Sequence, residues 1–330
     1  MQTVRKRKKK RIEWIDVVCY GFVILVVIVT LYPVLHLMAL SLSSSKAVSK
    51  NAVSIWPIGL NFQAYKQVMA TGTVPKSFVN SIIYTFIGTV INMLLTSTMA
   101  YALSKKRLPF YGFFTKFVLI TMYVSGGLIP SFLLVNSLGL FDSMWALILP
   151  SAISTYNLIV LRSFFAAMPE ELEESANLDG ANDLIVFWKI VLPLSKAGLA
   201  TVALFYLVGH WNSFYSAMIY LQDVDKYPLQ LILRNIVIQG QMASELAAAG
   251  QSAVAEELYG KVSVNSIKYA TLFISIVPMM IIYPFIQKYF VKGVYDRISE
   301  GITQRAWTRR RKNEINSWKN CLQSAMQRIK

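Results

Sequence analysis

The chain has 330 residues, of which 55% are hydrophobic and only 15% are charged, and its formal net charge is +16 at pH 7. Soluble domains carry about 25% charged residues, so this composition excludes an ordinary soluble protein and indicates one that lies in lipid. The basic residues gather beside apolar segments, which is typical of membrane orientation and argues against nucleic-acid binding as the reason for the charge.

Apolar segments long enough to cross a hydrocarbon core of about 30 Å recur along the chain. They predict an all-α membrane protein with about six transmembrane helices. A short basic segment, 1–14, precedes them, and the first apolar run is too long for a cleaved secretory signal. In chain order, the predicted spans are residues 15–40, 78–104, 112–135, 143–167, 190–221 and 267–291.

Three connecting segments and a tail complete the predicted organisation. Segments 41–77 and 222–266 contain Pro, Gly and mixed polar residues, which favours folded caps on the outer side; within the second, 243–257 is expected to be a short amphipathic helix or a loop tip. An acidic inner loop, 168–193, lies within the transmembrane core, 78–291. The basic tail, 292–330, suits either a helix on anionic lipid or on a partner protein, or a solvated segment.

The distribution of Lys and Arg predicts the orientation in the membrane. In this scheme 25 of the 33 basic residues lie on the side of the two termini and 8 on the opposite side. Cytoplasmic loops carry the excess of positive charge, so both termini are predicted to be cytoplasmic. Cys19 and Cys321 then both face a reducing compartment, and neither is assigned a role.

The acidic loop 168–193 is the most informative segment. Pro169 suits a first helical turn, because its missing N–H would have no partner there, and the glutamates after it lie where the helix dipole favours negative charge. Gly180 is expected to end this helix in a left-handed conformation, and Asn182 or Asp183 to cap a second one. Such an acidic element suits docking into another protein, although the same carboxylates also simply solubilise and cap a helix.

Several residues of the loop stand at a fixed spacing: Glu174-Ser175-Ala176, then Gly180 after three residues, then Ile190, Leu192 and Pro193 after nine more. This spacing resembles the cytoplasmic loop of ATP-binding-cassette (ABC) importer permeases, whose pattern is E-A-A, three residues, G, nine residues, I, one residue, L-P. Only Ser175 departs from the pattern. In that family the loop is the coupling helix that seats in a cleft of the ATPase.

Four further motifs extend the resemblance over about 78–293: residues 125–130 (SGGLIP), 211–214 (WNSF), 227–231 (YPLQL) and 288–293 (KYFVKG). They resemble the carbohydrate-uptake branch of the binding-protein-dependent, MalG-like permeases of the MetI type, in the group similar to LplC and YtcP. Members of this group generally end soon after the last motif. This chain continues, so the resemblance implies nothing about its tail.

The resemblance implies a type I ABC importer permease fold in the cytoplasmic membrane of a bacterium, with an oligosaccharide as the cargo. The implied partners are a second homologous permease subunit, two copies of a cytoplasmic ABC ATPase and an extracytoplasmic sugar-binding protein. No cofactor is expected on this chain, because ATP and Mg are used by the partner ATPase. The residues expected to couple to the ATPase are Glu170, Glu171, Glu174, Ser175, Ala176, Asp179, Gly180, Ile190, Leu192 and Pro193.

A sugar path needs amide, hydroxyl and aromatic groups that face a cavity. In the fifth predicted span Tyr206 and His210 share one helical stripe, and Trp211 and Tyr215 share another. Packing between helices explains such residues equally well, and in maltose-type transporters the permease that this chain resembles contributes less to the sugar site. The candidate path residues are Tyr156, Asn157, Tyr206, His210, Trp211, Asn212 and Tyr215.

Other functions find less support in the sequence. No G-x-x-x-x-G-K-[ST] motif is present, and the two histidines, His36 and His210, stand in no metal-ligand spacing. An ion-coupled carrier or channel is the main alternative, but it would need ionisable residues at mid-membrane, whereas Asp16, Asp142 and Arg162 fall near predicted span ends. A membrane-embedded enzyme would need a nucleophile, a metal set or a carboxylate pair, none of which is evident.

Overall fold

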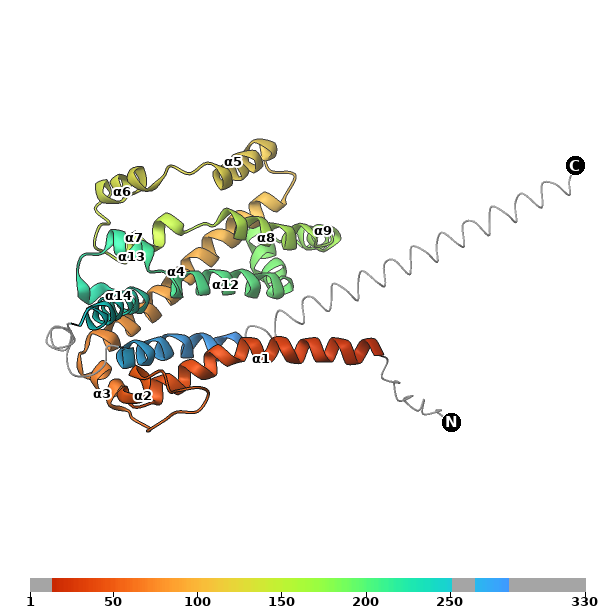
Figure 1. Ribbon diagram of the computed structural model, residues 1–330. Coiled ribbons are helices and arrows are strands. Elements are labelled where there is room, and N and C mark those ends of the chain that lie inside the picture. The colour runs from red at the N-terminus through yellow and green to blue at the C-terminus, as the bar shows by residue number, and fades with distance from the viewer. Residues whose placement is uncertain (1–13, 251–264, 285–330) are drawn as a thin grey trace, which may run out of the picture. The chain divides into compact units, whose positions relative to one another are not determined.

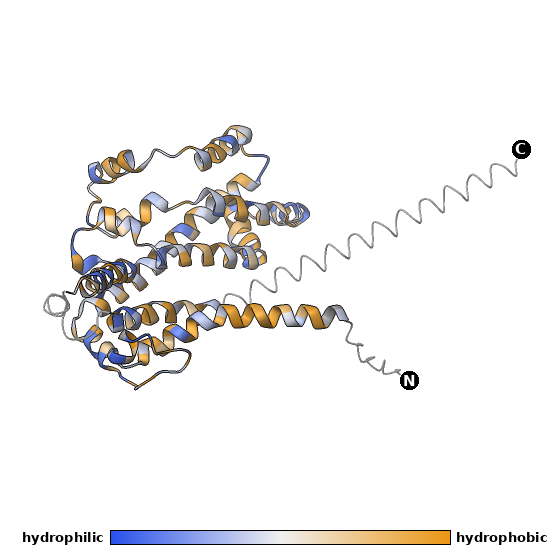
Figure 2. Ribbon diagram, in the orientation of Figure 1, coloured by the Kyte–Doolittle hydropathy of each residue, from blue (hydrophilic) through white to orange (hydrophobic). Residues whose placement is uncertain are grey.

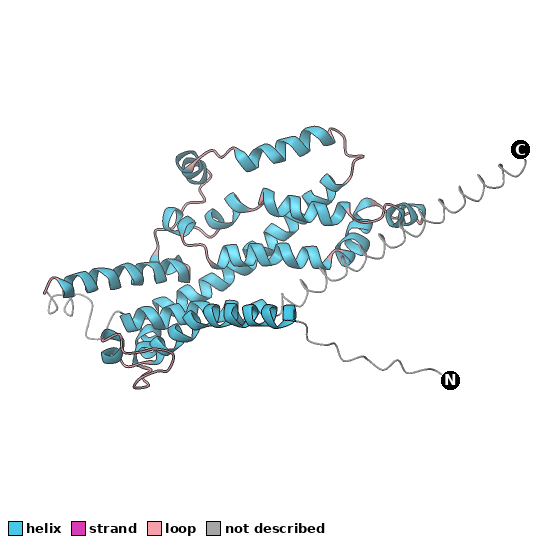
Figure 3. Cartoon of the chain, turned by 45° about the vertical axis from the view of Figure 1, so that its right-hand side comes forward, coloured by secondary structure: helices cyan, strands magenta, loops and turns pink. Residues whose placement is uncertain are grey.

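The computed structural model describes residues 14–250 and 265–284, and every regular element in these residues is a helix (Figure 3). Three helices are long and apolar enough to cross a membrane: Val17–Leu42 within α1 (Trp14–Leu42), α4 (Thr73–Ser104) and Asn265–Pro284. Three bent pairs of shorter helices raise the number to six if each pair is one span. The predicted all-α membrane fold with about six spans is therefore confirmed.

The chain divides into two compact units, and the first contains residues 14–79 and the described part of 227–277. It holds α1, α2 (Ser45–Ser49), α3 (Gln63–Ala70), α14 (Leu229–Ala248) and most of the helix Asn265–Pro284 (Figure 1). Helix α1 is apolar on all sides (Figure 2), and none of its most apolar stretch is buried within the molecule. A helix that is hydrophobic all round needs an apolar environment, which lipid supplies here.

The segment 41–77 is folded, as predicted. Ser43 Oγ accepts the N–H of Ile58 at 3.0 Å, and Tyr65 Oη donates to Ser41 Oγ at 2.9 Å. A small buried cluster, Ala39, Leu40, Ala47, Val48 and Val53, closes the end of α1 against α2. In the other predicted outer segment α14 continues to Ala248, so part of 243–257 is helical; residues 251–264 lie outside the described residues.

The second unit contains residues 80–226 together with 278–284. Its buried core joins Ala100 and Leu103 of α4, Leu161 and Phe165 of α8, and Val202 of α12, among others. Its elements after α4 are α5 (Tyr111–Tyr123), α6 (Leu128–Ser137), α7 (Trp145–Ile148), η1 (Leu149–Ser151), α8 (Thr155–Ala166), α9 (Glu171–Leu178), α10 (Asp183–Val186), η2 (Phe187–Val191), α11 (Leu192–Leu194), α12 (Lys196–Trp211), α13 (Tyr215–Tyr220) and η3 (Val224–Lys226).

The third, fourth and fifth predicted spans are broken rather than continuous, which corrects the sequence prediction. Helices α5 and α6 meet at 112° across an extended connection (Figure 1), where Gly127 has a φ of +81° that favours glycine. The helices on either side of residues 152–154 meet at 54°, and Ser154 Oγ caps α8 by accepting the N–H of Asn157 at 3.5 Å.

The third break lies at Ser195, where α10–α11 and α12 meet at 83°. Two local features precede it. Residues 187–191 form a π-helical turn, a distortion that often marks functional sites, and Pro193 has no N–H to donate to the preceding turn. The fifth span was predicted over 190–221, but its straight part is α12 alone, and α12 ends at Trp211.

Gly198 marks a close approach of α12 to α8, and we expect a single methyl group there to destabilise the fold. A Cβ at this position would lie 2.5 Å from the ring of Phe164, near the stem of that side chain, where the ring has little room to yield. Gly198→Ala is expected to cost about 1–3 kcal/mol by overpacking. The measurement is the thermal unfolding midpoint of the purified protein in detergent.

The matched control is Gly112→Ala in α5, where a Cβ meets nothing within 4 Å. Glycine to alanine in a helix interior otherwise stabilises by up to about 1 kcal/mol, so the control is expected to keep or raise the midpoint. A Gly198→Ala midpoint equal to that of the control would contradict the close approach.

Candidate functional site

The acidic loop folds as two short helices with a turn between them, as predicted. Helix α9 carries Glu171, Glu173 and Glu174 in its first turn, where the helix dipole favours carboxylates. The helix begins at Glu171 after the cap residue Glu170. Pro169 therefore lies before the helix and not in its first turn, which corrects the prediction for that residue.

The turn of the loop depends on Gly180. Its φ is +82°, the left-handed conformation expected for it. The Gly180 N–H donates to Asn177 O at 3.0 Å, and the Ala181 N–H donates to Ala176 O at 2.9 Å, which together close the end of α9. Asn182, and not Asp183, caps the second helix, because its Oδ1 accepts the N–H of Ile185 at 2.9 Å.

The two faces of the loop differ in chemistry. On the inner face Ala176, Ile190 and Leu192 pack against the core of the second unit. On the outer face Leu178 is 89% exposed and Leu184 68% exposed, amid carboxylates. Several exposed apolar side chains grouped within a polar rim are typical of a protein-binding surface. We name this outer face the docking face and define it by Glu171, Glu174, Leu178, Asp179, Gly180, Leu184 and Trp188, all of which are exposed.

The predicted coupling residues fall into two sets that differ in exposure to solvent. Gly180, Glu171, Glu174 and Asp179 lie on the docking face, and Glu170 and Ser175 are also exposed. Of the remaining four, Ala176, Ile190 and Leu192 are partly buried and Pro193 is exposed.

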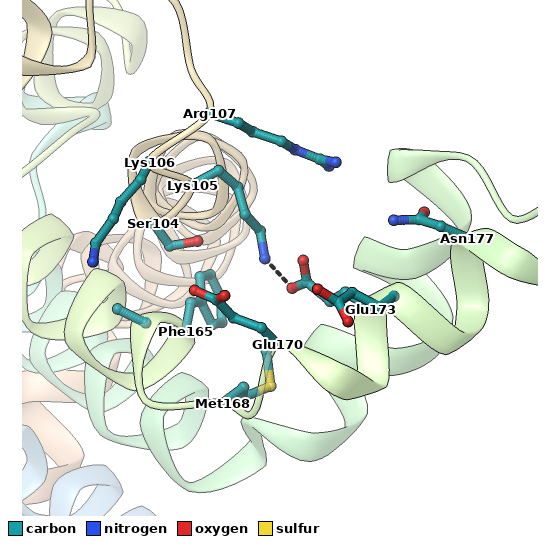
Figure 4. A pocket seen from close by; sticks show the side chains of 11 residues that line it. Ser104, Lys105, Lys106, Arg107, Phe165, Met168, Glu170, Glu173 and Asn177 are labelled. Carbon is teal, nitrogen blue, oxygen red and sulfur yellow. Dashed lines mark hydrogen bonds and ion pairs between the residues drawn. The ribbon is translucent and has the colours of Figure 1, made fainter.

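Two ion pairs tie the loop to the end of α4 and the turn after it. Lys105 pairs with Glu173 of α9, and Arg107 pairs with Asp183 of α10. Figure 4 shows Lys105 reaching toward Glu173 across a cavity of about 430 Å³, with Glu170 beside them. The first pair is largely buried, with side-chain exposures of 18% and 15%, whereas those of the second are 56% and 63%.

Sequence reasoning missed this pairing. It assigned Lys105 and Arg107 only to membrane orientation and omitted Glu173 and Asp183 from the coupling residues. Burial lowers the pKa of Lys105, with a further lowering from the nearby Arg107 guanidinium, while Asp183 and Glu170 act in the opposite sense. The one signal in the sequence was the opposite charge of the two loops, which shows attraction but not which residues pair.

A second candidate site is a polar chamber of about 320 Å³ between α4, η1, α8 and α12. Tyr206 Oη lies 2.7 Å from Thr96 Oγ1 and accepts the N–H of Ser154 at 2.9 Å. Asn92 Nδ2 lies 3.0 Å from His210 Nε2. The lining is mostly uncharged and polar: Asn92, Ser151, Ser154, Asn157, Tyr206, Gly209, His210, Ser213 and Ser216, with Leu147 and Phe205.

The chamber unites some of the predicted path residues and leaves others apart. Tyr206 and His210, predicted to share one stripe of a helix, both line it, as does Asn157. The second predicted stripe, Trp211 with Tyr215, does not exist, because α12 ends at Trp211 and a new helix begins at Tyr215. Those two residues, together with Tyr156 and Asn212, are outside the chamber lining.

A third polar cluster joins two loops of the second unit at the end opposite the acidic loop along α4. The Asp142 carboxylate accepts the N–H groups of Gln222 at 2.9 Å and Asp223 at 3.1 Å, and Lys226 Nζ approaches it to 2.5 Å. The hydrogen bond from Lys226, followed by those from the two backbone N–H groups, lowers the pKa of Asp142 to about 2. Asp142 raises the pKa of Lys226 in turn.

We expect Asp142→Asn to lower the thermal unfolding midpoint by a few degrees at pH 7. The pKa of Asp142 is about 2 in the fold and that of a free aspartate about 3.9. Its stabilising effect is therefore fully present above about pH 4 and is lost as the pH falls toward 2. The difference between wild type and variant, measured from pH 7 down to pH 3, should shrink only below about pH 4. Glu171→Gln, at an exposed carboxylate, is the control, and an equal loss in the control would contradict a specific role for Asp142.

Within residues 14–250 and 265–284, no three His, Cys, Asp or Glu side chains lie close enough together to hold a metal ion. His36 Nδ1 lies 2.7 Å from Ser54 O in the first unit, and Cys19 is exposed on α1. Cys321 and the tail lie outside the described residues.

Comparisons with known proteins extend over most of the chain. Residues 13–295 match the family described as "Binding-protein-dependent transport system inner membrane component". The polygalacturonan/rhamnogalacturonan transport system permease protein YtcP of Bacillus subtilis (strain 168) is 41% identical over 279 residues, which cover 84% of this chain and 95% of YtcP. LplC of the same organism is 41% identical over 266 residues, which cover 81% of this chain and 88% of LplC.

A solved structure is similar along most of the chain. It is a crystal structure of a bacterial ABC transporter involved in the import of the acidic polysaccharide alginate. The TM-score is 0.74 at 31% sequence identity, and the match covers 87% of this chain and 100% of the other. The type I ABC importer permease fold expected from the sequence is thereby shown.

Proposed function

The chain belongs to the family of binding-protein-dependent transport system inner membrane components, and on that premise we propose that it conducts an oligosaccharide across the membrane. It is a permease subunit of an ABC importer, a membrane protein whose relatives are permeases for sugars. The observation that supports coupling of this permease to an ATPase is the acidic loop, in which a left-handed Gly180 and an exposed acidic and apolar docking face occur at the family spacing.

The names of relatives support a carbohydrate as cargo. Besides YtcP, a diacetylchitobiose uptake permease of Streptomyces coelicolor is 26% identical over 82% of this chain. Two of the compared proteins handle acidic polysaccharides, polygalacturonan and alginate. Short oligosaccharides of uronic acids are therefore the first probes for this chain.

We assign the ATP hydrolysis that drives transport to a separate subunit. The family name implies a substrate-binding protein, and its ABC class implies an ATPase. The assembly we propose has this chain, a second homologous permease, two copies of the ATPase and an extracytoplasmic sugar-binding protein. This chain would hold no ATP or Mg itself, and both its termini would face the cytoplasm, beside the ATPase.

The contacts of the loop suggest how movement would pass into the membrane. The ATPase would hold the docking face. On the other side of the loop, Phe187 is buried against Tyr101 of α4, with ring centroids 5.2 Å apart, and Lys105 pairs with Glu173. Closing of the ATPase dimer would then displace the loop together with α4, as packed elements move in rigid-body transitions.

The test is native mass spectrometry of the tagged chain, extracted from its own host in mild detergent. A complex with a second hydrophobic subunit and two copies of one ATPase is the expected result. A lone chain or a homo-oligomer in several gentle detergents would overturn the proposed assembly and favour an ion-coupled carrier, for which the comparisons give no support.

A further inference from the structure

The polar chamber contains a buried group that lacks a partner. Asn92 is 1% exposed, and its Nδ2 atom lies 3.0 Å from His210 Nε2 and 3.4 Å from Ser151 O. Its carbonyl oxygen, Oδ1, is buried and has no hydrogen-bond partner in the protein. An unsatisfied buried acceptor costs about 1–3 kcal/mol, so a group of this kind calls for an explanation.

The chamber lies deep within the span. At 1.5 Å per residue, Asn92 is about 18 Å from the Ser104 end of α4 and about 28 Å from the Thr73 end. Polar groups at such depth face protein or water and not lipid. Thr85 and Thr89 stand on the same face of α4, two turns and one turn before Asn92, and their hydroxyl oxygens are also buried without partners. These two hydroxyls lie outside the chamber lining, so Asn92 is the unpaired group of α4 that lines it.

The shape of the chamber is fixed by its neighbours. Tyr206 is held by Thr96 and by the Ser154 N–H. The ring of His210 lies over Gly88, where a Cβ would come within 2.6 Å of Nε2. Only a residue without a side chain permits this position of the ring. Asn92, Tyr206 and His210 are therefore preorganised, which reduces the entropy that a ligand must lose on binding.

We propose that this chamber binds hydroxyl groups of the transported sugar within this subunit. The proposal rests on the proposed function and names the residues that would act in it. Asn92 Oδ1 would accept a hydrogen bond from a sugar hydroxyl, and the Asn157 amide, which is 6% exposed, offers a donor and an acceptor nearby. These groups bear no full charge, which suits hydroxyls better than carboxylates.

The volume of the chamber and the aromatic rings near it suit a sugar. The volume of about 320 Å³ falls at the lower end of ligand pockets, which run from about 300 to 1,000 Å³. Phe205 lines the chamber, and its ring centroid is 6.2 Å from that of Tyr156, whose side chain is 56% exposed. Phe205 thus gives the apolar face of a pyranose a surface to stack on within the chamber, and Tyr156 continues this aromatic surface outside the lining.

The first measurement is sugar transported per ATP hydrolysed by the whole transporter, purified from its host and reconstituted in liposomes with its sugar-binding protein. The probe is whichever labelled short oligogalacturonide, rhamnogalacturonan disaccharide or diacetylchitobiose the wild type imports. Asn92→Leu and Asn157→Leu are expected to lower the ratio at least tenfold, while ATP hydrolysis stimulated by the loaded binding protein stays within about threefold. Asn136→Leu, at an exposed asparagine of α6, should leave the ratio unchanged.

A second measurement does not depend on the leucine variants folding normally. In a chain with Cys19→Ser and Cys321→Ser, Asn157→Cys should react with a small, charged methanethiosulfonate reagent. Saturating probe sugar, delivered by its binding protein, should slow the reaction at least threefold.

The outcomes separate this proposal from the proposed function. Wild-type import of a probe with unchanged ratios in both leucine variants, or a thiol that reacts equally with and without sugar, overturns the chamber as a sugar site and leaves the importer intact. A parallel fall of transport and of ATP hydrolysis overturns it too, since a merely structural role predicts that result. Failure of the wild type to import any oligosaccharide overturns the function first and the sugar site with it.

Discussion

Gly180→Arg is expected to reduce uptake at least a hundredfold while the chain still inserts in the membrane at close to wild-type levels. The glycine has a φ of +82°, and a Cβ there meets nothing within 4 Å. An arginine would therefore project outward from the docking face, adding bulk and a positive charge among Glu171, Glu174 and Asp179. The ATPase should then seat poorly, and both uptake and sugar-stimulated ATP hydrolysis should fall. The measurements are uptake by cells, membrane level by immunoblot and co-purification of the ATPase.

Two controls separate docking from backbone strain at Gly180. Gly180→Ala imposes the same left-handed conformation on a residue with a Cβ, at a cost of about 1–2 kcal/mol, but adds no bulk or charge, so most uptake should remain. Gly139→Arg places the same residue at another glycine with a φ of +67° and open space around it, far from the loop in sequence. Normal uptake in Gly180→Arg, or equal loss in Gly180→Ala, would count against the docking face.

Reversing the largely buried ion pair between α4 and the loop is expected to give the second large effect. In Lys105→Glu, two carboxylates would meet beneath α9, and in Glu173→Lys two ammonium groups would do so. Breaking a buried pair costs about 3–5 kcal/mol, because a charge is left without compensation. This pair is 15–18% exposed, so we expect part of that cost and at least a tenfold loss of uptake in each single variant.

The double variant, with Lys105→Glu and Glu173→Lys together, should recover at least half of the wild-type uptake, because it restores opposite charges at the same two positions. The matched contrast is the exposed pair Arg107–Asp183. Exposed pairs are worth about 0.2–1 kcal/mol, so reversing either of its charges should change uptake less than about fivefold. Absence of recovery in the double variant would show that the two residues act separately.

Sequence reasoning was most successful where local rules decide the structure. The role of Gly180 follows from helix-capping chemistry within a few residues and was predicted, and the cap of the second helix was predicted to be Asn182 or Asp183. The number of spans followed from the length and number of the apolar segments alone. The choice between Asn182 and Asp183 as the cap could not be made from residue type, because both accept backbone N–H groups well; in the fold Asn182 is the cap and Asp183 pairs with Arg107.

The breaks in the spans and about half of the chamber could not be predicted from the sequence, because they depend on tertiary structure. Glycine in a helix permits a kink or a close approach of another helix, so the pair Gly126-Gly127 does not by itself predict the 112° turn between α5 and α6. Tyr206 and His210 were linked through their spacing on one helix. Their partner Asn92 is 118 residues from His210 in sequence, and no pattern within either helix indicates that they meet. Trp211 and Tyr215 show the reverse error, since a helical spacing was assumed across a helix end.

The part of α4 that belongs to the second unit, residues 80–104, is held by contacts near both of its ends. At one end Lys105 follows it and pairs with the acidic loop. At the other, Asn80 Nδ2 donates to Asp225 O at 2.8 Å, and Tyr84 Oη donates to Lys226 O at 2.9 Å, beside Asp142. From Asn80 to Ser104 the helix measures about 36 Å, with Asn92 at its midpoint.

Helix α4 thus connects the acidic loop near one end to the loop of Lys226 near the other, with the chamber at its midpoint. A tilt of about 10° about the Asn80 end would carry Ser104 through about 6 Å and Asn92 through about 3 Å, by the length of the helix alone. A displacement of 3 Å exceeds the tolerance of a hydrogen bond. A displacement that begins at the acidic loop would thus break the hydrogen bond of Asn92 to a bound hydroxyl, while the hydrogen bonds of Asn80 and Tyr84 hold the other end of the helix.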